Sequence, residues 1–147
     1  MDKEKEELLK QWLGKGKGEL GVAEFLSGNY HPTPDETICY LCQQSAEKYI
    51  KGYIFYNDIE PEKIHNLKDL LKVCQNVNAE FSLLTTKVSI LNDYSVLPRY
   101  PNELAISEEE MKRAISYAKS VQEFILNVIE KTEQEKQQKE NEEKETE

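Results

Sequence analysis

The chain has 147 residues, of which 38% are apolar and 32% charged, and its net charge is −9. This length fits one domain with a core that needs no disulfide or metal. The acidic balance argues against general coating of RNA or DNA, because each neutralised phosphate needs a Lys or Arg. Three cysteines, with no signal peptide and no long apolar run, predict a cytoplasmic protein without a membrane span.

The first predicted helix covers residues 4–28, with Trp12, Leu13 and Leu20 on its apolar side. Four glycines interrupt its middle: Gly14, Gly16, Gly18 and Gly21. Each costs about 0.8–1 kcal/mol relative to Ala in a helix interior. Either the helix bends there, or the glycines let a neighbouring helix approach closely. We expect one continuous helix that is held by packing.

The next predicted element is a long helix over residues 33–56, around which the rest of the chain is organised. Thr33 can cap it, Pro34 takes the first helical position, and Glu36 is placed to reach back to the cap. Apolar side chains then recur at a helical period, at Ile38, Leu41, Cys42, Ala46, Tyr49, Ile50, Tyr53 and Ile54. Polar residues 43–48 lie in its middle, which makes this helix the first place to look for function.

Two shorter helices and a loop separate this helix from another long one. The shorter helices are predicted over 67–77 and 79–93, and two prolines keep residues 94–106 from forming a regular helix. Ser107 and Glu110 form a capping box that opens the last helix. This helix matches the central one in length, so the two can pack along their whole extent.

The pattern predicts an all-α fold, because no segment shows the strict alternation of a half-buried strand. We expect an antiparallel up-and-down bundle of about five helices over residues 1–130, with the two long helices at its centre. Residues 131–147 hold four Lys and seven Glu but no aliphatic or aromatic side chain. This tail is predicted to be a solvated helical extension or disordered.

Few residues offer metal or cofactor chemistry. Cys39 and Cys42 form a CxxC inside a helix, where a thiolate would not be stabilised, and Cys74 is the only other cysteine. Buried, inert cysteines are therefore expected. The usual phosphate-loop, dinucleotide, zinc-protease and nucleophile-elbow motifs are absent from the sequence, so no cofactor and no metal site are predicted.

One arginine is a candidate for anion recognition. Arg99 lies between two prolines, near Tyr94 and Tyr100, and the chain has only one other Arg. Such an Arg is preorganised for bidentate binding of an anion, or it bridges helix ends and braces the loop. Any catalytic histidine would have to be His31 or His65, and His65 can equally be structural, at the start of a helix.

Residues 39–48, CYLCQQSAEK, followed by Lys51, resemble the signature helix of HEPN domains (higher eukaryotes and prokaryotes nucleotide-binding). Trp12-Leu13, Glu19-Leu20 and Ala23 resemble the family's first helix, although Gly16 stands where that helix usually carries Ala. The similarity continues through the chain in the family's order, over about residues 9–130.

Two shorter motifs follow in the same order. His65-Asn66-Leu67 resembles the family's "threonine-histidine-x-leucine" motif, with Ile64 in place of the Thr. Arg99-Tyr100-Pro101 resembles the Arg-Tyr-Pro loop of one branch, and Ala114 and Ala118 fit its last helix.

The resemblance implies a bundle of about five helices that forms a homodimer, with a cleft near the dimer interface. Many members are ribonucleases or toxins that use an Arg followed four to six residues later by His. Others act beside a minimal nucleotidyltransferase. No His follows Arg99 in this chain, and RNA cleavage needs a group that titrates near neutrality at the scissile phosphate. The sequence therefore assigns no catalytic residue.

We expect a HEPN-like module that binds a nucleotide or pairs with a nucleotidyltransferase-type protein, in a toxin–antitoxin-like setting; the absence of the ribonuclease motif's His argues against catalysis. Arg99 would meet the phosphate, and Glu47 would orient His65. The candidate ligand-binding residues are Arg99, Tyr100, Gln44, Glu47, Lys48 and His65. One alternative is a HEPN-type ribonuclease or toxin with a displaced base such as His65. Another is a dimeric scaffold without a ligand.

Overall fold

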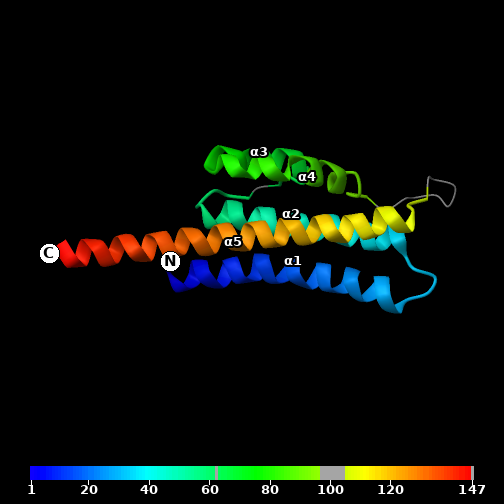
Figure 1. Cartoon of the computed structure of the whole chain (residues 1–147), viewed down its shortest axis with the longest axis horizontal. Helices are drawn as coiled ribbons and strands as arrows, with labels where there is room; N and C mark the ends of the chain where they lie inside the picture. Colours follow the sequence, from blue (N-terminus) through cyan, green and yellow to red (C-terminus); the bar gives the residue numbers. More distant parts are fainter. Residues whose placement is uncertain (62, 97–104, 147) are drawn as a thin grey trace.

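The computed structural model describes residues 1–61, 63–96 and 105–146, and within these ranges all regular structure is helical (Figure 1). The predicted all-α helical bundle is confirmed. Its elements are α1 (Lys3–Asn29), α2 (Asp35–Tyr56), α3 (Leu67–Val77), the 3₁₀ helix η1 (Ala79–Leu84), α4 (Thr85–Asn92) and α5 (Glu108–Thr146). Helix α2 contacts each of the four other α-helices, which makes it the central element.

Helix α1 is continuous, as expected, and packs antiparallel against α2 at Gly16. The Ser45 hydroxyl donates a 2.6 Å hydrogen bond to the Gly16 carbonyl. A Cβ at Gly16 would lie 2.7 Å from the Tyr49 ring, so glycine is what allows this close approach. The other three glycines in the middle of α1 would have open space around an added Cβ: Gly14, Gly18 and Gly21.

The structure differs from the sequence-based expectation in the direction of α5, which runs parallel to α2. Gln122 of α5 donates a 2.8 Å hydrogen bond to the Tyr49 hydroxyl, and further along both helices Tyr56 donates to Glu133. The reason is the connection over 57–66, whose described residues form no helix. Extended, ten residues span about 33 Å, so the chain can run back along α2 before α3 begins, and His65 accordingly lies beside Lys51 of α2.

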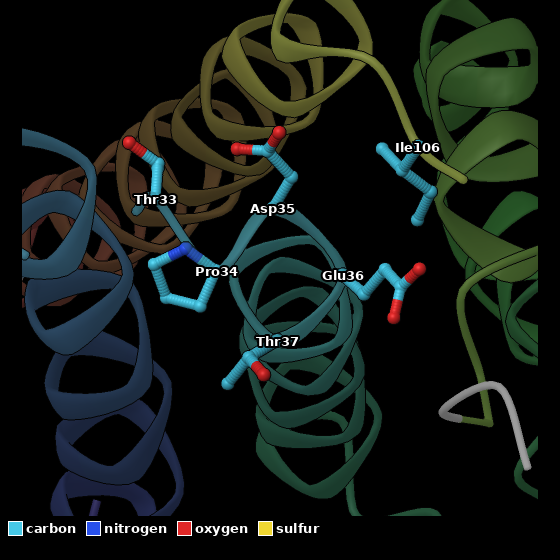
Figure 2. Close-up of a pocket in the computed structure, with 6 residues that line it drawn as sticks. All are labelled: Thr33, Pro34, Asp35, Glu36, Thr37 and Ile106. Carbon is cyan, nitrogen blue, oxygen red and sulfur yellow. The ribbon is translucent and has the colours of Figure 1, made fainter. Parts of the chain in front are cut away.

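The start of α2 corrects the predicted cap. Helix α2 begins at Asp35, its N-cap is Pro34, and no side chain caps it. Because Pro34 has a non-helical backbone, Thr33 lies too far back to reach the first helical N–H groups. Figure 2 shows the Thr33 and Glu36 side chains on opposite sides of the helix start. The predicted capping box at Thr33 is therefore wrong.

Other predicted helix starts are confirmed. Asn66 accepts a 2.9 Å hydrogen bond from the Lys68 N–H, and the Ser107 hydroxyl accepts one of 3.1 Å from the Glu110 N–H. The single helix predicted over 79–93 is divided into η1 and α4.

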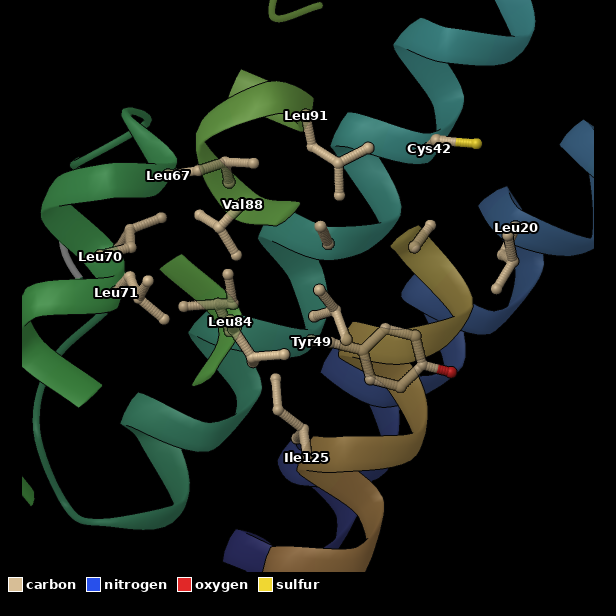
Figure 3. Close-up of a cluster of buried hydrophobic side chains, with 14 of the residues drawn as sticks. Leu20, Cys42, Tyr49, Leu67, Leu70, Leu71, Leu84, Val88, Leu91 and Ile125 are labelled. Atoms are coloured by element: carbon tan, nitrogen blue, oxygen red, sulfur yellow. The ribbon is translucent and has the colours of Figure 1, made fainter. Parts of the chain in front are cut away.

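The core lies where α2 meets the other helices (Figure 3). Tyr49 of α2, Leu20 of α1, Ile125 of α5 and Leu70 of α3 are all fully or almost fully buried in it. The three cysteines, Cys39, Cys42 and Cys74, are free and buried. The prediction that the cysteines are buried is confirmed, and burial raises the pKa of each thiol to about 12, which disfavours the reactive thiolate.

Helix α5 continues through the polar tail to Thr146, and residues 134–146 are exposed. In Figure 1 this red end of α5 projects past the other helices. Within the described residues, the tail is thus a helical extension. Arg99 and Tyr100 lie outside the described residues. None of the helices in the described ranges is long and apolar enough to cross a membrane.

Candidate functional site

A line of three polar side chains interrupts the buried face of α2 midway along the helix. Gln43, Glu47 and Lys51 follow one another at intervals of four residues, so they project from the same side. Their exposed fractions are only 1%, 6% and 5%. A buried Glu and Lys are rare unless they are paired, so their partners define the site.

The Glu47 carboxylate is the centre of this cluster. It accepts a 3.5 Å hydrogen bond from the Gln43 amide, and Lys51 Nζ lies 3.3 Å from its other oxygen. His65 reaches in from the connection before α3, with Nδ1 3.5 Å from Glu47 Oε2 and 3.3 Å from Lys51 Nζ. The buried charges therefore neutralise each other, and the contacts hold the imidazole against α2.

A second row of polar side chains lies beside the first and faces α1. Lys48 Nζ is 3.3 Å from Gln44 Oε1 and 3.3 Å from a carboxylate oxygen of Glu19. The Gln44 amide donates a 2.7 Å hydrogen bond to Gln43 Oε1, which joins the two rows. Burial raises the pKa of Glu19, and the nearby Lys48 partly offsets that rise. Each of these side chains is thus fixed by a neighbour before any ligand arrives.

The two rows border a cavity of about 460 Å³ between α1, α2 and the segments that carry His65 and Ser95. Its lining residues are Trp12, Lys15, Gln43, Gln44, Glu47, Lys48, Lys51, His65 and Ser95. They include three Lys and one Glu, so the cavity is locally positive on an acidic chain. Among the described residues, no group of three or more His, Cys, Asp or Glu side chains could hold a metal ion.

Another cavity, of about 280 Å³, lies at the start of α2 (Figure 2). Its described lining contains the carboxylates of Asp35 and Glu36 and no cationic side chain. This lining has neither the fixed network nor the mixture of donors and charges found around Glu47. The cavity beside Glu47 is therefore the better candidate site.

The structure brings together four of the six predicted site residues, because Gln44, Glu47, Lys48 and His65 all line the larger cavity. Lys51 also lines this cavity although it is not one of the six predicted residues. Its spacing of four residues from Glu47, next to the apolar stripe, is the sequence pattern that indicates it. Trp12, Lys15 and Ser95 come from other elements, and no local pattern marks them.

Together, the fold and this site define an all-α helical domain with a polar cavity beside its central helix. The HEPN domain model matches residues 9–131, so the chain belongs to the HEPN domain family. The expected family membership is confirmed.

Two solved structures share the fold. The crystal structure of ST0689, an archaeal HEPN homologue, is 22% identical with a TM-score of 0.61, and the match covers 82% of this chain and 97% of that one. The crystal structure of TT1696 from Thermus thermophilus is 19% identical with a TM-score of 0.64, covering 81% and 96%. At these identities the likeness concerns the fold alone. No curated protein matches the sequence.

Proposed function

We propose that this HEPN domain is a nucleotide-binding or interaction module that is partnered by a nucleotidyltransferase-type protein. The proposal of nucleotide binding rests on the residues that line the larger cavity. Lys15 and Lys48 supply ammonium groups for a phosphate, beside Lys51, which is paired with Glu47, and the Trp12 indole supplies a flat apolar surface for a base. An anionic group and an aromatic ring, linked within one small molecule, match these features.

The size and the order of the cavity support the same ligand class. A volume of about 460 Å³ falls within the range of roughly 300–1,000 Å³ that is typical of small-molecule sites. The partly buried Gln44 amide, already held by hydrogen bonds, can pair with the polar edge of a base. Preorganised side chains lose little entropy when a ligand binds.

Arg99 and Tyr100 keep their place in the proposal as the phosphate contact and a contact beside the base or loop. Arg99 follows Ser95 by four residues, and Ser95 lines the cavity. The covalent chain alone keeps the two Cα atoms within about 14 Å of each other.

Calorimetric titration of the purified chain with AMP tests the nucleotide proposal. We expect Lys48→Ala and Arg99→Ala each to weaken AMP binding about tenfold, since each removes a charge-assisted contact with a phosphate. Lys119→Ala is the control, because Lys119 pairs with Glu24 and does not line the cavity. Unchanged AMP affinity in folded Lys48→Ala and Arg99→Ala would refute this site assignment.

The nucleotidyltransferase partner is proposed from family membership alone. Its test is co-expression with a minimal nucleotidyltransferase encoded beside this chain, followed by size-exclusion chromatography. We expect one complex that contains both proteins. Separate elution of the two proteins, or a genome with no such neighbouring gene, contradicts the proposal.

A ribonuclease with a displaced base is a second candidate, favoured by one contact. Glu47 lies 3.5 Å from His65 Nδ1, while the His65 side chain is 71% exposed. A carboxylate that orients an accessible imidazole is an arrangement suited to general acid–base work. This candidate predicts RNA cleavage by the purified protein, lost in His65→Ala and in Arg99→Ala. Intact RNA after prolonged incubation with the native protein eliminates it.

A further inference from the structure

We propose that Glu47 determines which nucleotide the cavity binds. Because of Glu47, the cavity selects a nucleoside monophosphate over a di- or triphosphate. This inference rests on the proposed nucleotide binding and adds a residue that decides which nucleotide fits. It follows from the charges around the cavity and from the partners that Glu47 holds.

The charge of the described site is small. Lys15, Lys48 and Lys51 contribute three positive charges, and Glu47 removes one. Glu19, which contacts Lys48 at 3.3 Å, removes another and leaves a net charge near +1 with neutral His65. A phosphate monoester carries about −1.5 to −2 at neutral pH, and each added phosphate contributes about one further negative charge. Even with the one positive charge of Arg99, the proposed phosphate contact, the site would carry about +2, and a triphosphate carries about −4.

The Glu47 carboxylate is itself an anion on the inner side of the cavity, where it already contacts the groups that could bind a second phosphate. The Glu47 side chain is 8% exposed and contacts Lys51 and His65. The two lysines that remain for a ligand are the exposed Lys15 and the half-buried Lys48. These two ammonium groups can contact one phosphate, and any further phosphate would lie against the Glu47 carboxylate or in solvent.

A purely structural role for Glu47 makes a different prediction. If Glu47 only neutralised the buried Lys51, its replacement would change stability and would affect all nucleotides alike. A role in specificity changes the ratio of the affinities for different nucleotides. The ratio of the ATP and AMP dissociation constants is therefore the quantity that distinguishes the two roles.

The experiment is calorimetric titration of the full chain with AMP, ADP and ATP in magnesium-free buffer. We expect the native protein to bind AMP about tenfold more tightly than ATP, with ADP between them. In Glu47→Gln the preference for AMP over ATP should fall about tenfold. The substitution makes the site more positive and frees the groups that Glu47 contacts, Lys51 and His65. Glu24→Gln makes the same chemical change outside the cavity and should leave the ratio unchanged.

Two further variants keep the test decisive if Glu47→Gln alone does not fold, since it leaves a buried amine unpaired. Lys51→Met should increase the preference for AMP over ATP beyond that of the native protein. The double variant Glu47→Gln/Lys51→Met restores the native net charge of the site and should return the ratio close to its native value. Circular dichroism checks that each variant is folded.

The outcomes separate this inference from the proposed function. ATP binding as tight as AMP binding in the native protein, or an equal change for all three nucleotides in Glu47→Gln, overturns the role of Glu47 and leaves nucleotide binding standing. Failure of all three nucleotides to bind any of the proteins overturns the proposed function, and this inference with it.

Discussion

Tyr49 is the side chain that joins the three long helices. It is 1% exposed, its ring lies against Gly16 of α1, and its hydroxyl accepts a hydrogen bond from Gln122 of α5. Because both ends of this side chain are held, the ring cannot move to make room for a methyl group on α1. Gly16 is therefore fixed by packing, unlike the glycines whose surroundings are open.

We predict opposite effects for two glycine substitutions on the same helix. Gly16→Ala should lower the free energy of unfolding by about 1–3 kcal/mol, through overpacking against Tyr49. Gly18→Ala should raise it by about 0.5–1 kcal/mol, since an added Cβ has open space and alanine favours the helix. Urea denaturation of both variants measures the difference. Equal stabilities would mean that α1 and α2 are not in close contact at Gly16.

The buried thiols predict a loss of stability in alkali. The pKa of each of Cys39, Cys42 and Cys74 rises from 9.0 to about 12 in the folded chain. Above pH 9.0 the unfolded state releases these protons while the folded state keeps them, so stability falls as the pH rises. Each thiol contributes about 1.4 kcal/mol per pH unit there.

Urea denaturation under reducing conditions at several pH values, from about 8 to 10.5, measures this slope. Cys74→Ala should make the free energy of unfolding fall less steeply with pH, by the contribution of one thiol. This holds whatever the substitution does to stability at neutral pH. A slope that does not change in Cys74→Ala would show that this thiol ionises in the folded state as easily as in the unfolded one.

Among the elements, α5 has two parts with different surroundings. Near the end of the bundle the buried Tyr56 hydroxyl donates to Glu133, and Lys136 Nζ lies 5.0 Å from the centre of the Tyr56 ring. Beyond that point α5 is exposed, and it is supported by contacts such as the Gln138–Glu142 hydrogen bond. The first turn of the polar tail thus takes part in packing, although its sequence contains no apolar residue.

Two truncations of α5 should therefore differ in stability. Removal of residues 137–147 should change the free energy of unfolding by less than about 0.5 kcal/mol, because residues 137–146 are all exposed. Removal of residues 132–147 should cost about 1–3 kcal/mol, because the buried Tyr56 hydroxyl loses its acceptor. Thermal and urea unfolding of both proteins compare them. Equal stabilities would place the domain boundary at residue 130, as the sequence predicts.

For the whole molecule, the homodimer expected from the family stays a prediction. Sedimentation or light scattering at several protein concentrations should show a mass that approaches twice the 17.1 kDa of one chain. Dilution should shift the mass toward that of one chain if the dimer dissociates. A mass of one chain at every concentration contradicts the dimer.

Local geometry explains which of the predicted site residues lie close together. Gln44, Glu47 and Lys48 lie on one helix, whose period fixes their relative positions. His65 was paired with Glu47 from the order of the family motifs, and the two groups do lie 3.5 Å apart. Trp12 and Lys15 could not be placed, because their distance from α2 depends on how α1 packs. The predicted cap at Thr33 failed because the backbone of Pro34 is not helical.

The sequence by itself determined the helices, their apolar faces, the buried cysteines and the family, because each depends on local periodicity or on motifs along the chain. Only the tertiary structure decided that α5 runs parallel to α2, since a ten-residue connection can either turn sharply or run back along a helix. It also decided that His65 meets Glu47 beside a cavity. Such a meeting depends on distances between elements, which the periodicity of a single helix does not contain.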